Sequence, residues 1–363
     1  MGAALARRGA NLARSRSVPF TRNRWLVLGL AVAAGLAIIV GLRVRRGGPD
    51  DIERLWTTDA LPRLPEPAEN GWQLVADAKA DLPIDFPTEH LGDVSALLAD
   101  PDTVWTKLDE QDSTMSPIIA AFKQSAYRDV WHRARVLRRF ADAQRDEPGG
   151  IEVLLSHLHR VAVLDFLLDA RGGHWDEALE GMQRLLEIEL DYQASARDVL
   201  AQSLAATMLA DGMSATVALV DRATAEGVEQ SLREQLRETA IAAEFEPHVD
   251  RMVVLQYARL TDGLDRLVAE SETPAAILSP SAWLFSPKNT SVEFNRYFRA
   301  LMPAVVDGTP PPAAPAAEHC PLRLDPVGCA FLALAEVASV LPGQGEHVIQ
   351  TLQRASAAQA RLR

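Results

Sequence analysis

The chain has 363 residues, of which 48% are hydrophobic and 24% are charged. A chain of this length can bury a sizeable core, and these fractions exclude a disordered or collagen-like protein. Its 33 arginines against 4 lysines, together with abundant alanine, are typical of a G+C-rich genome, and we expect a bacterial source.

The charge is unevenly distributed along the chain. Residues 1–46 hold nine arginines and no acid, whereas the rest has 28 basic and 49 acidic residues, a net charge of 28 − 49 = −21. A strongly acidic body repels phosphate backbones, so no nucleic-acid partner is expected. The basic arm, residues 1–24, is better explained by the segment that follows it.

Trp25–Leu42 is a stretch of eighteen residues without a charge, bounded by Arg24 and Arg43. As a helix it would be about 27 Å long, close to the thickness of roughly 30 Å of a bilayer's hydrocarbon core. Because a backbone in lipid must satisfy its own hydrogen bonds, we predict a transmembrane helix at 25–42. The alternatives are a buried core helix, which the flanking arginines disfavour, and a cleaved signal peptide, which the length and the Arg43–Arg46 segment disfavour.

The arginines around this segment also predict its orientation. Six precede it and three follow it, so the positive-inside rule places the N-terminus in the cytoplasm and the main domain outside. The expectation is a single-pass protein of the inner (cytoplasmic) membrane, with a cytoplasmic body as the alternative. Within the segment, small residues recur every fourth position and predict a helix-packing face, although abundant Gly and Ala explain them equally: Gly29, Ala33, Ala37 and Gly41.

The remainder of the chain is predicted to be all-α, because apolar residues recur at helical spacing and no useful β-alternation occurs. The clearest unit is an αα-hairpin of helices 151–170 and 175–191, joined at Gly172-Gly173. The segment Gly173–Ala178 is similar to the start of the second helix of a tetratricopeptide repeat, so the fold is TPR-like in part, without a regular array. Further helices are expected at 196–210, 215–225, 230–243, 247–268 and 291–304, with a loop over 271–291.

These elements predict a division of the chain into six parts. They are a basic cytoplasmic arm, the transmembrane helix, a linker, an irregular helical domain, a Pro/Ala-rich linker and a C-terminal helical pair, at 1–24, 25–42, 43–67, 68–307, 308–325 and 326–363. The last pair is expected to pack on the main domain, because four apolar side chains need a surface to cover them: Phe331, Leu334, Val337 and Leu341.

The chain has two cysteines, Cys320 and Cys329, nine positions apart. In an oxidising periplasm they can close a short loop, and the predicted orientation favours this disulfide. The alternative is that Cys329, which lies in an apolar run, is a small buried core residue.

The sequence contains none of the common metal-binding, nucleotide-binding or nucleophile motifs HExxH, CxxC, GxxxxGK, GxGxxG and GxSxG. No catalytic, cofactor-binding or metal-binding residue is therefore predicted, and no cofactor. His157 and His159 lie two residues apart on a helix, so they point to different faces and cannot chelate one metal. The cluster Glu244–Asp250 crudely resembles a carboxylate–histidine site, although acids at a helix start explain it.

A basic amphipathic stretch occupies residues 128–144, with four apolar side chains expected to face inward: Val130, Val136, Leu137 and Phe140. Within it, His132 lies among four arginines, at positions 133, 135, 138 and 139. Such a group predicts either an anion-binding patch or a solvated helix face.

Four short motifs together resemble an uncharacterised group of bacterial, membrane-anchored, all-helical envelope proteins: Asn70-Gly71-Trp72, Gly173–Ala178, Ser286–Thr290 and Asp325–Gly328. The chain departs from that group where Lys288 separates Pro from Asn and where Asp325 replaces an Asn. The resemblance implies the helical architecture and carries over no catalytic residue.

The function expected from the sequence is a non-enzymatic interaction or scaffolding module of the bacterial cell envelope, with the membrane and another protein as partners. Two alternatives stay open. One is an envelope enzyme with an unfamiliar site, and the other is an anchored helical protein that faces the cytoplasm.

Overall fold

A computed structural model describes residues 54–56, 66, 69–141, 151–196, 199–244, 249–271, 285–313, 315–316, 320 and 325–363. The predicted transmembrane helix and its small-residue stripe lie outside the described residues. Within them the protein is all-helical and has no strand, and one isolated bridge joins Asn70 to Arg139. The predicted fold class is thus confirmed at the level of an all-α architecture.

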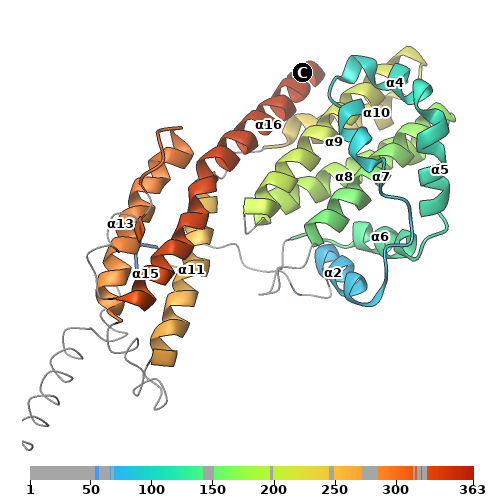
Figure 1. Ribbon diagram of the computed structural model, residues 1–363. Helices are drawn as coiled ribbons and strands as arrows, with labels where there is room; N and C mark the ends of the chain where they lie inside the picture. Colours follow the sequence, from blue (N-terminus) through green and yellow to red (C-terminus); the bar gives the residue numbers. More distant parts are fainter. Residues whose placement is uncertain are drawn as a thin grey trace, which may run out of the picture.

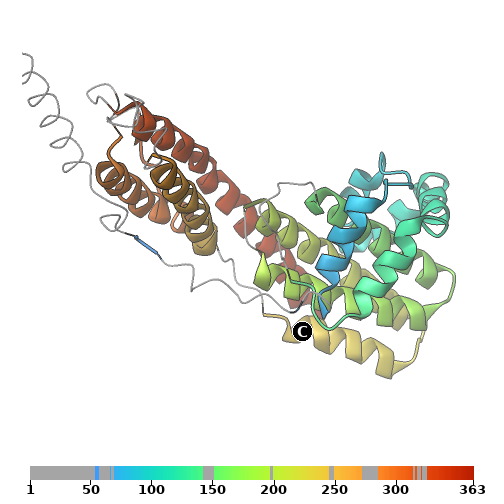
Figure 2. The ribbon, with the colours of Figure 1, turned by 90° about the horizontal axis from the view of Figure 1, so that it is seen from below.

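The helices form two lobes that share one long helix (Figures 1 and 2). The first lobe holds α2 (Gly71–Asp81), α3 (Leu91–Leu97), η4 (Pro101–Thr103), α4 (Val104–Glu110), α5 (Asp112–Phe122), α6 (Ala126–Val136), α7 (Ile151–Arg171), α8 (Trp175–Ser195), α9 (Val199–Ala225) and α10 (Gln230–Ala242). The second lobe holds α11 (Val249–Ser271), α13 (Pro287–Val306), α15 (Pro326–Ala335), η7 (Glu336–Val340) and the start of α16 (Leu341–Leu362).

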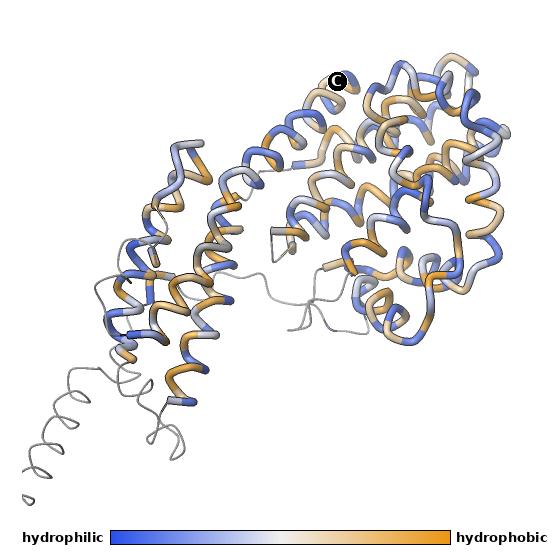
Figure 3. The backbone as a smooth tube through the Cα atoms, viewed as in Figure 1, coloured by the Kyte–Doolittle hydropathy of each residue, from blue (hydrophilic) through white to orange (hydrophobic). Residues whose placement is uncertain are grey.

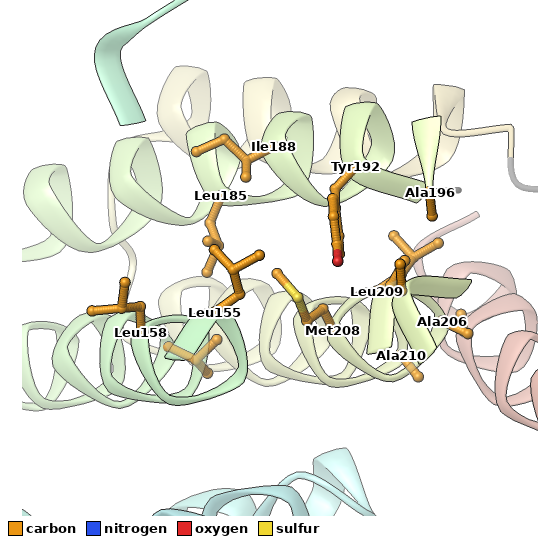
Figure 4. Close-up of a cluster of buried hydrophobic side chains, with 14 of the residues drawn as sticks. Leu155, Leu158, Leu185, Ile188, Tyr192, Ala196, Ala206, Met208, Leu209 and Ala210 are labelled. Carbon is orange, nitrogen blue, oxygen red and sulfur yellow. The ribbon is translucent and has the colours of Figure 1, made fainter. Parts of the chain in front are cut away.

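The helical hairpin predicted around Gly172-Gly173 is α7 and α8. Gly173 has a φ of +83°, a conformation that costs glycine little and that ends α7 before Trp175 begins α8. The two helices and α9 bury a shared cluster of leucines, alanines and Tyr192 (Figure 4). Along most helices, hydrophobic and hydrophilic segments alternate, as amphipathic helices packed on one side require (Figure 3).

Helix α9 runs unbroken through the centre of the first lobe. The sequence predicted two helices here, 196–210 and 215–225, and the structure corrects this to one, Val199–Ala225. Gly212 lowers helix propensity, but all ten residues 211–220 are buried, and packing on every side overrides the propensity of one residue. A second correction concerns α13, which begins at Pro287, inside the predicted loop 271–291, because proline suits the first position of a helix.

Among the described residues, two helices are long and apolar enough to cross a membrane, Leu200–Ala225 and Pro326–Leu362. Their most apolar eighteen residues differ in burial, 83% in the first and 38% in the second. Core helices of globular proteins satisfy the same length and composition test, so the burial of Leu200–Ala225 identifies it as the core of the first lobe.

Helix α16 connects the lobes. At its C-terminal end, Gln359 Nε2 donates to the carbonyls of Ala240 and Ala243, both at 2.8 Å, and so ties α16 to the end of α10. Nearer its start, Gly345 packs against Val305 of α13. A side chain at position 345 would crowd Val305, so glycine allows the two helices to approach closely.

The linker before the first lobe makes contact with the second lobe. The backbone N–H of Leu55 donates to Tyr257 Oη at 2.7 Å, and the Trp56 ring lies edge-on to the Tyr257 ring, with centroids 5.1 Å apart. Arg54 forms an ion pair of 2.5 Å with Asp265 on the same helix, α11. Residues 54–56 of the linker are therefore fixed to α11.

The two cysteines are joined in the structure. Cys320 and Cys329 form a disulfide with their Cα atoms 5.5 Å apart, a normal span for this bond. It links the start of α15 to the segment that precedes it.

Candidate functional site

A pocket of about 240 Å³ lies where the end of α5 meets α6 and α7. Its apolar wall is aromatic, and charged side chains of both signs surround this wall. The lining residues are Phe122, Trp131, Phe166, Ala162, Lys123, Arg128, Asp129, His132, Arg135 and Asp165.

The basic stretch of the sequence contributes to this pocket through only part of its length. His132 and Arg135 line it, whereas Arg133 and Arg138 are exposed to solvent. Arg139 turns away and holds Asp191, with Nη2 and Oδ1 2.8 Å apart. The four arginines thus do not act as one patch: of these four only Arg135 lines the pocket, together with Arg128 from the start of the same helix.

The end of α6 is held by an arginine of α8. Arg184 Nε donates to the carbonyl of Arg135 at 2.6 Å, and its Nη2 donates to the carbonyl of Leu137. These bonds satisfy backbone carbonyls that a helix end leaves without partners. The backbone of Leu137 is extended, so α6 ends at Val136. The side chain of Val136 is 68% exposed, and the sequence prediction that Val136 faces inward is wrong.

Arg135 is the charged group best placed to bind a ligand in this pocket. Its guanidinium carbon lies 5.1 Å from the centroid of the Phe166 ring, an attractive cation–π position. Burial lowers the pKa of Arg135, and the carboxylate of Asp165 opposes that shift. Within the part of the chain that the structure describes, Arg135 Nε is buried without a hydrogen-bond acceptor, and so is Trp131 Nε1.

The lysine of the pocket is paired with two acids of α7. Lys123 Nζ lies 2.8 Å from Asp165 Oδ1 and 3.8 Å from Asp169 Oδ1. Lys123 is therefore held by acids of α7, which leaves Arg135 as the group with an unfilled donor. An anion entering the pocket would meet the Arg135 guanidinium beside an aromatic wall, with Arg128 and His132 also in the lining.

A second group of ionisable residues is sealed inside the first lobe. His159 Nε2 of α7 lies 2.8 Å from Glu189 Oε1 of α8, and the two side chains are 2% and 0% exposed. Burial lowers the pKa of His159 to about 3, and burial together with Asp211 raises the pKa of Glu189 well above its usual range. The native pair is accordingly a neutral imidazole bonded to a protonated carboxyl.

Gly212 of α9 makes room for this pair. A Cβ atom at position 212 would overlap both oxygens of Glu189, so the glycine lets α9 close over the carboxyl. The neighbouring Asp211 accepts from Ser95 Oγ at 2.7 Å and from Arg354 Nη2 at 3.4 Å. These polar groups connect α7, α8 and α9, but no described pocket reaches them, so we assign them a structural role.

The other sequence candidates do not form a site in the described structure. Glu244 and Asp250 are exposed, and residues 245–248 of the Glu244–Asp250 cluster lie outside the described residues. Gly29, Ala33, Ala37 and Gly41 also lie outside them. Across the described ranges, no group of three His, Cys, Asp or Glu side chains could hold a metal ion.

No protein-family model, curated protein or solved structure matches this chain. The pocket's own residues therefore carry the functional argument.

Proposed function

We propose that the protein is a membrane-anchored, extracytoplasmic binding module of the bacterial envelope, and that its pocket on α6 receives an acidic group of a partner protein. The anchor is the uncharged segment Trp25–Leu42 with its arginine flanks. The body is a helical scaffold that holds the pocket open to solvent.

The observation that carries the binding role is the state of Arg135. A half-buried guanidinium stacked on Phe166, with a buried Nε that lacks an acceptor among the described residues, is suited to a planar acceptor such as a carboxylate. The aromatic wall of Phe122, Trp131 and Phe166 would contact the apolar stem of the same ligand residue. A glutamate side chain or a C-terminal carboxylate on a protein segment combines these two features.

The test compares two arginines of α6 in the full chain. Arg135→Met removes the guanidinium while keeping an apolar stem over Phe166, and Arg133→Met removes an exposed charge from the same helix. The probe is a fluorescent tetraglutamate peptide, with a tetraglutamine peptide as the uncharged comparison and inorganic phosphate as a competing anion.

We expect Arg135→Met to weaken binding of the acidic peptide by about tenfold or more, because a charge-assisted hydrogen bond contributes about 1.5–3 kcal/mol. Arg133→Met should leave the affinity nearly unchanged. Equal losses in both variants would show that only the general charge of α6 attracts the peptide, and the pocket would then have no specific role. Displacement by millimolar phosphate would redirect the proposal to phosphate groups.

The anchor and the orientation are tested separately. The chain should stay with membranes in alkaline carbonate, and protease added to cells with a permeabilised outer envelope should digest the body. Protection of the body from that protease would support the alternative in which the domain faces the cytoplasm.

A further inference from the structure

The outward face of α15 is apolar and has no cover within the described structure. The helix, PVGCAFLALA, contains no charged residue, and Phe331 and Leu332 bury one side of it. Ala330, Ala333 and Leu334 share the opposite side and are exposed, and Val340 of η7 continues it. Leu334 and Val340 are 55% and 56% exposed, so the sequence prediction that the main domain covers Leu334 is wrong.

The burial of this region contrasts with that of α9. Both helices pass the length and apolarity test for a membrane span, yet the protein buries 83% of the α9 window and only 38% of the window that begins in α15. The outward face of α15 is therefore left open to solvent by the rest of the described chain.

The linker fixes where this face lies relative to the anchor. Eleven residues, 43–53, separate the predicted transmembrane helix from Arg54, and even fully extended they span about 40 Å. Arg54 is ion-paired with Asp265 of α11. The linker therefore keeps Arg54, and with it α11, within about 40 Å of the end of the predicted anchor.

The docked linker and α15 meet at one aromatic cluster. The ring of Trp56 contacts that of Tyr257, Tyr257 stacks on Phe294, and Phe294 contacts Phe331 of α15, with centroid distances of 5.1, 5.2 and 5.3 Å. The tethered segment and the apolar helix are thus held on the same lobe, three ring contacts apart.

We propose that the outward face of α15 and η7 rests on the lipid surface of the membrane that anchors the chain. This inference rests on the proposed anchor and adds a second, peripheral contact to it. A helix lying in the interfacial plane buries its apolar face among headgroups and acyl chains, which suits the outward side chains Ala330, Ala333, Leu334 and Val340.

The size of the face favours lipid over a second copy of the chain. A ten-residue helix is about 15 Å long and 10 Å wide, which gives a footprint of roughly 150 Å². A stable protein–protein interface needs about 800 Å² on each partner. A membrane contact needs far less area, because the anchor already keeps the lobe near the bilayer.

The experiment uses the full chain reconstituted into vesicles of phosphatidylethanolamine and phosphatidylglycerol. The photo-crosslinking residue benzoylphenylalanine replaces Leu334 in one sample. In the matched control it replaces Val153, a 54% exposed residue of α7 in the first lobe. After irradiation, mass spectrometry identifies what each position has captured.

We expect lipid adducts at position 334 and none at position 153. An adduct between two copies of the chain at position 334 would overturn the proposal in favour of self-association. Equal lipid capture at both positions, or none at 334, would also overturn it.

Carbonate extraction of the same vesicles distinguishes a wrong α15 contact from a wrong transmembrane anchor. If the chain stays in the vesicles and position 334 captures no lipid, the α15 contact is wrong and the anchor stands. If carbonate releases the chain, the anchor is wrong, and the α15 proposal fails with it.

Discussion

The buried His159–Glu189 pair predicts a plateau in the stability of the protein against pH. In the native state the pKa of His159 is about 3 and that of Glu189 lies well above 4.5, so the pair holds one proton over the range between. In the unfolded chain the ordinary pKa values of 6.5 and 4.5 apply. The unfolded pair therefore holds two protons below pH 4.5, one between 4.5 and 6.5, and none above 6.5.

The slope of stability with pH follows from the difference in bound protons, about 1.4 kcal/mol per proton and pH unit. His159, whose pKa is lowered, contributes stability above pH 6.5 that is lost as the pH falls toward 3. Glu189, whose pKa is raised, contributes stability below pH 4.5 that is lost as the pH rises. Between pH 4.5 and 6.5 the two slopes cancel, and the pair leaves the free energy of unfolding independent of pH. Below and above that range the pair makes the free energy of unfolding fall.

Glu189→Gln tests the number of protons assigned to the pair, because the substitution removes one titrating group and preserves the shape of the side chain. The amide can donate to the neutral imidazole, so at pH 6 the free energy of unfolding should fall by less than about 1.5 kcal/mol. Because the raised pKa of Glu189 makes the stability of the natural chain decline as the pH rises, the variant should lose that decline above pH 6.5. Urea unfolding of the full chain in detergent micelles, followed by tryptophan fluorescence at pH 6, 7 and 8, measures both.

Glu180→Gln, an exposed change on the same helix, is the control and should leave the pH slope unchanged. Parallel slopes for Glu189→Gln and the natural chain above pH 6.5 would refute the proton count. A loss of about 3–5 kcal/mol at pH 6 would instead show that the native pair is ionic, because the substitution would then leave a buried imidazolium without its partner.

Two further predictions concern links near the ends of the folded body. Asn70 caps α2 at Trp72 and exchanges two hydrogen bonds with the backbone of Ala141, so Asn70→Ala should lower the free energy of unfolding by about 2–4 kcal/mol in urea titrations. An unchanged midpoint would show that water replaces these bonds. Reduction of the Cys320–Cys329 disulfide should lower stability by about 2.5–3 kcal/mol on the chain-entropy model, and melting with and without reductant measures it. Identical melting curves would mean that the bond is absent from the protein.

The sequence predicted the helical class and the α7–α8 hairpin because these depend on local signals. Apolar spacing and the Gly172-Gly173 turn act within a few residues, and no distant contact opposes them. The break predicted near Gly212 failed for the opposite reason. Packing of α7, α8, α10 and α16 around α9 outweighs the low helix propensity of one glycine there.

The buried pair has a signal in the sequence that no short motif contains. His159 lies four residues after Leu155, and Glu189 lies four after Leu185, so both ionisable residues occupy inward positions of apolar stripes. Two polar residues at core positions of consecutive helices predict a partner for each. The identity of that partner follows only from the register of the hairpin, which places them 2.8 Å apart.

From the sequence, the basic side chain of the pocket could be predicted only as one of two alternatives. The cluster around His132 predicted either an anion-binding patch or a solvated face, and in the structure its arginines divide, with Arg135 lining the pocket and Arg133 in solvent. What separates the two arginines is the packing of α6 against Phe166 of α7, a contact across thirty residues. Helical spacing within α6 does not contain that information.

Apolarity over eighteen residues does not by itself separate a membrane span from a core helix, and α9 shows which feature does. Inside α9, Asp211 takes hydrogen bonds from Ser95 and Arg354, and Gln202 donates to the carbonyl of Ala196. Such side chains need partners that only surrounding protein supplies, so their presence fits a helix enclosed by other helices. Trp25–Leu42 has no polar side chain except the indole N–H of Trp25, at the end where a bilayer interface would lie. It contains no group that would need a protein partner, and this difference from α9 favours lipid as its surroundings.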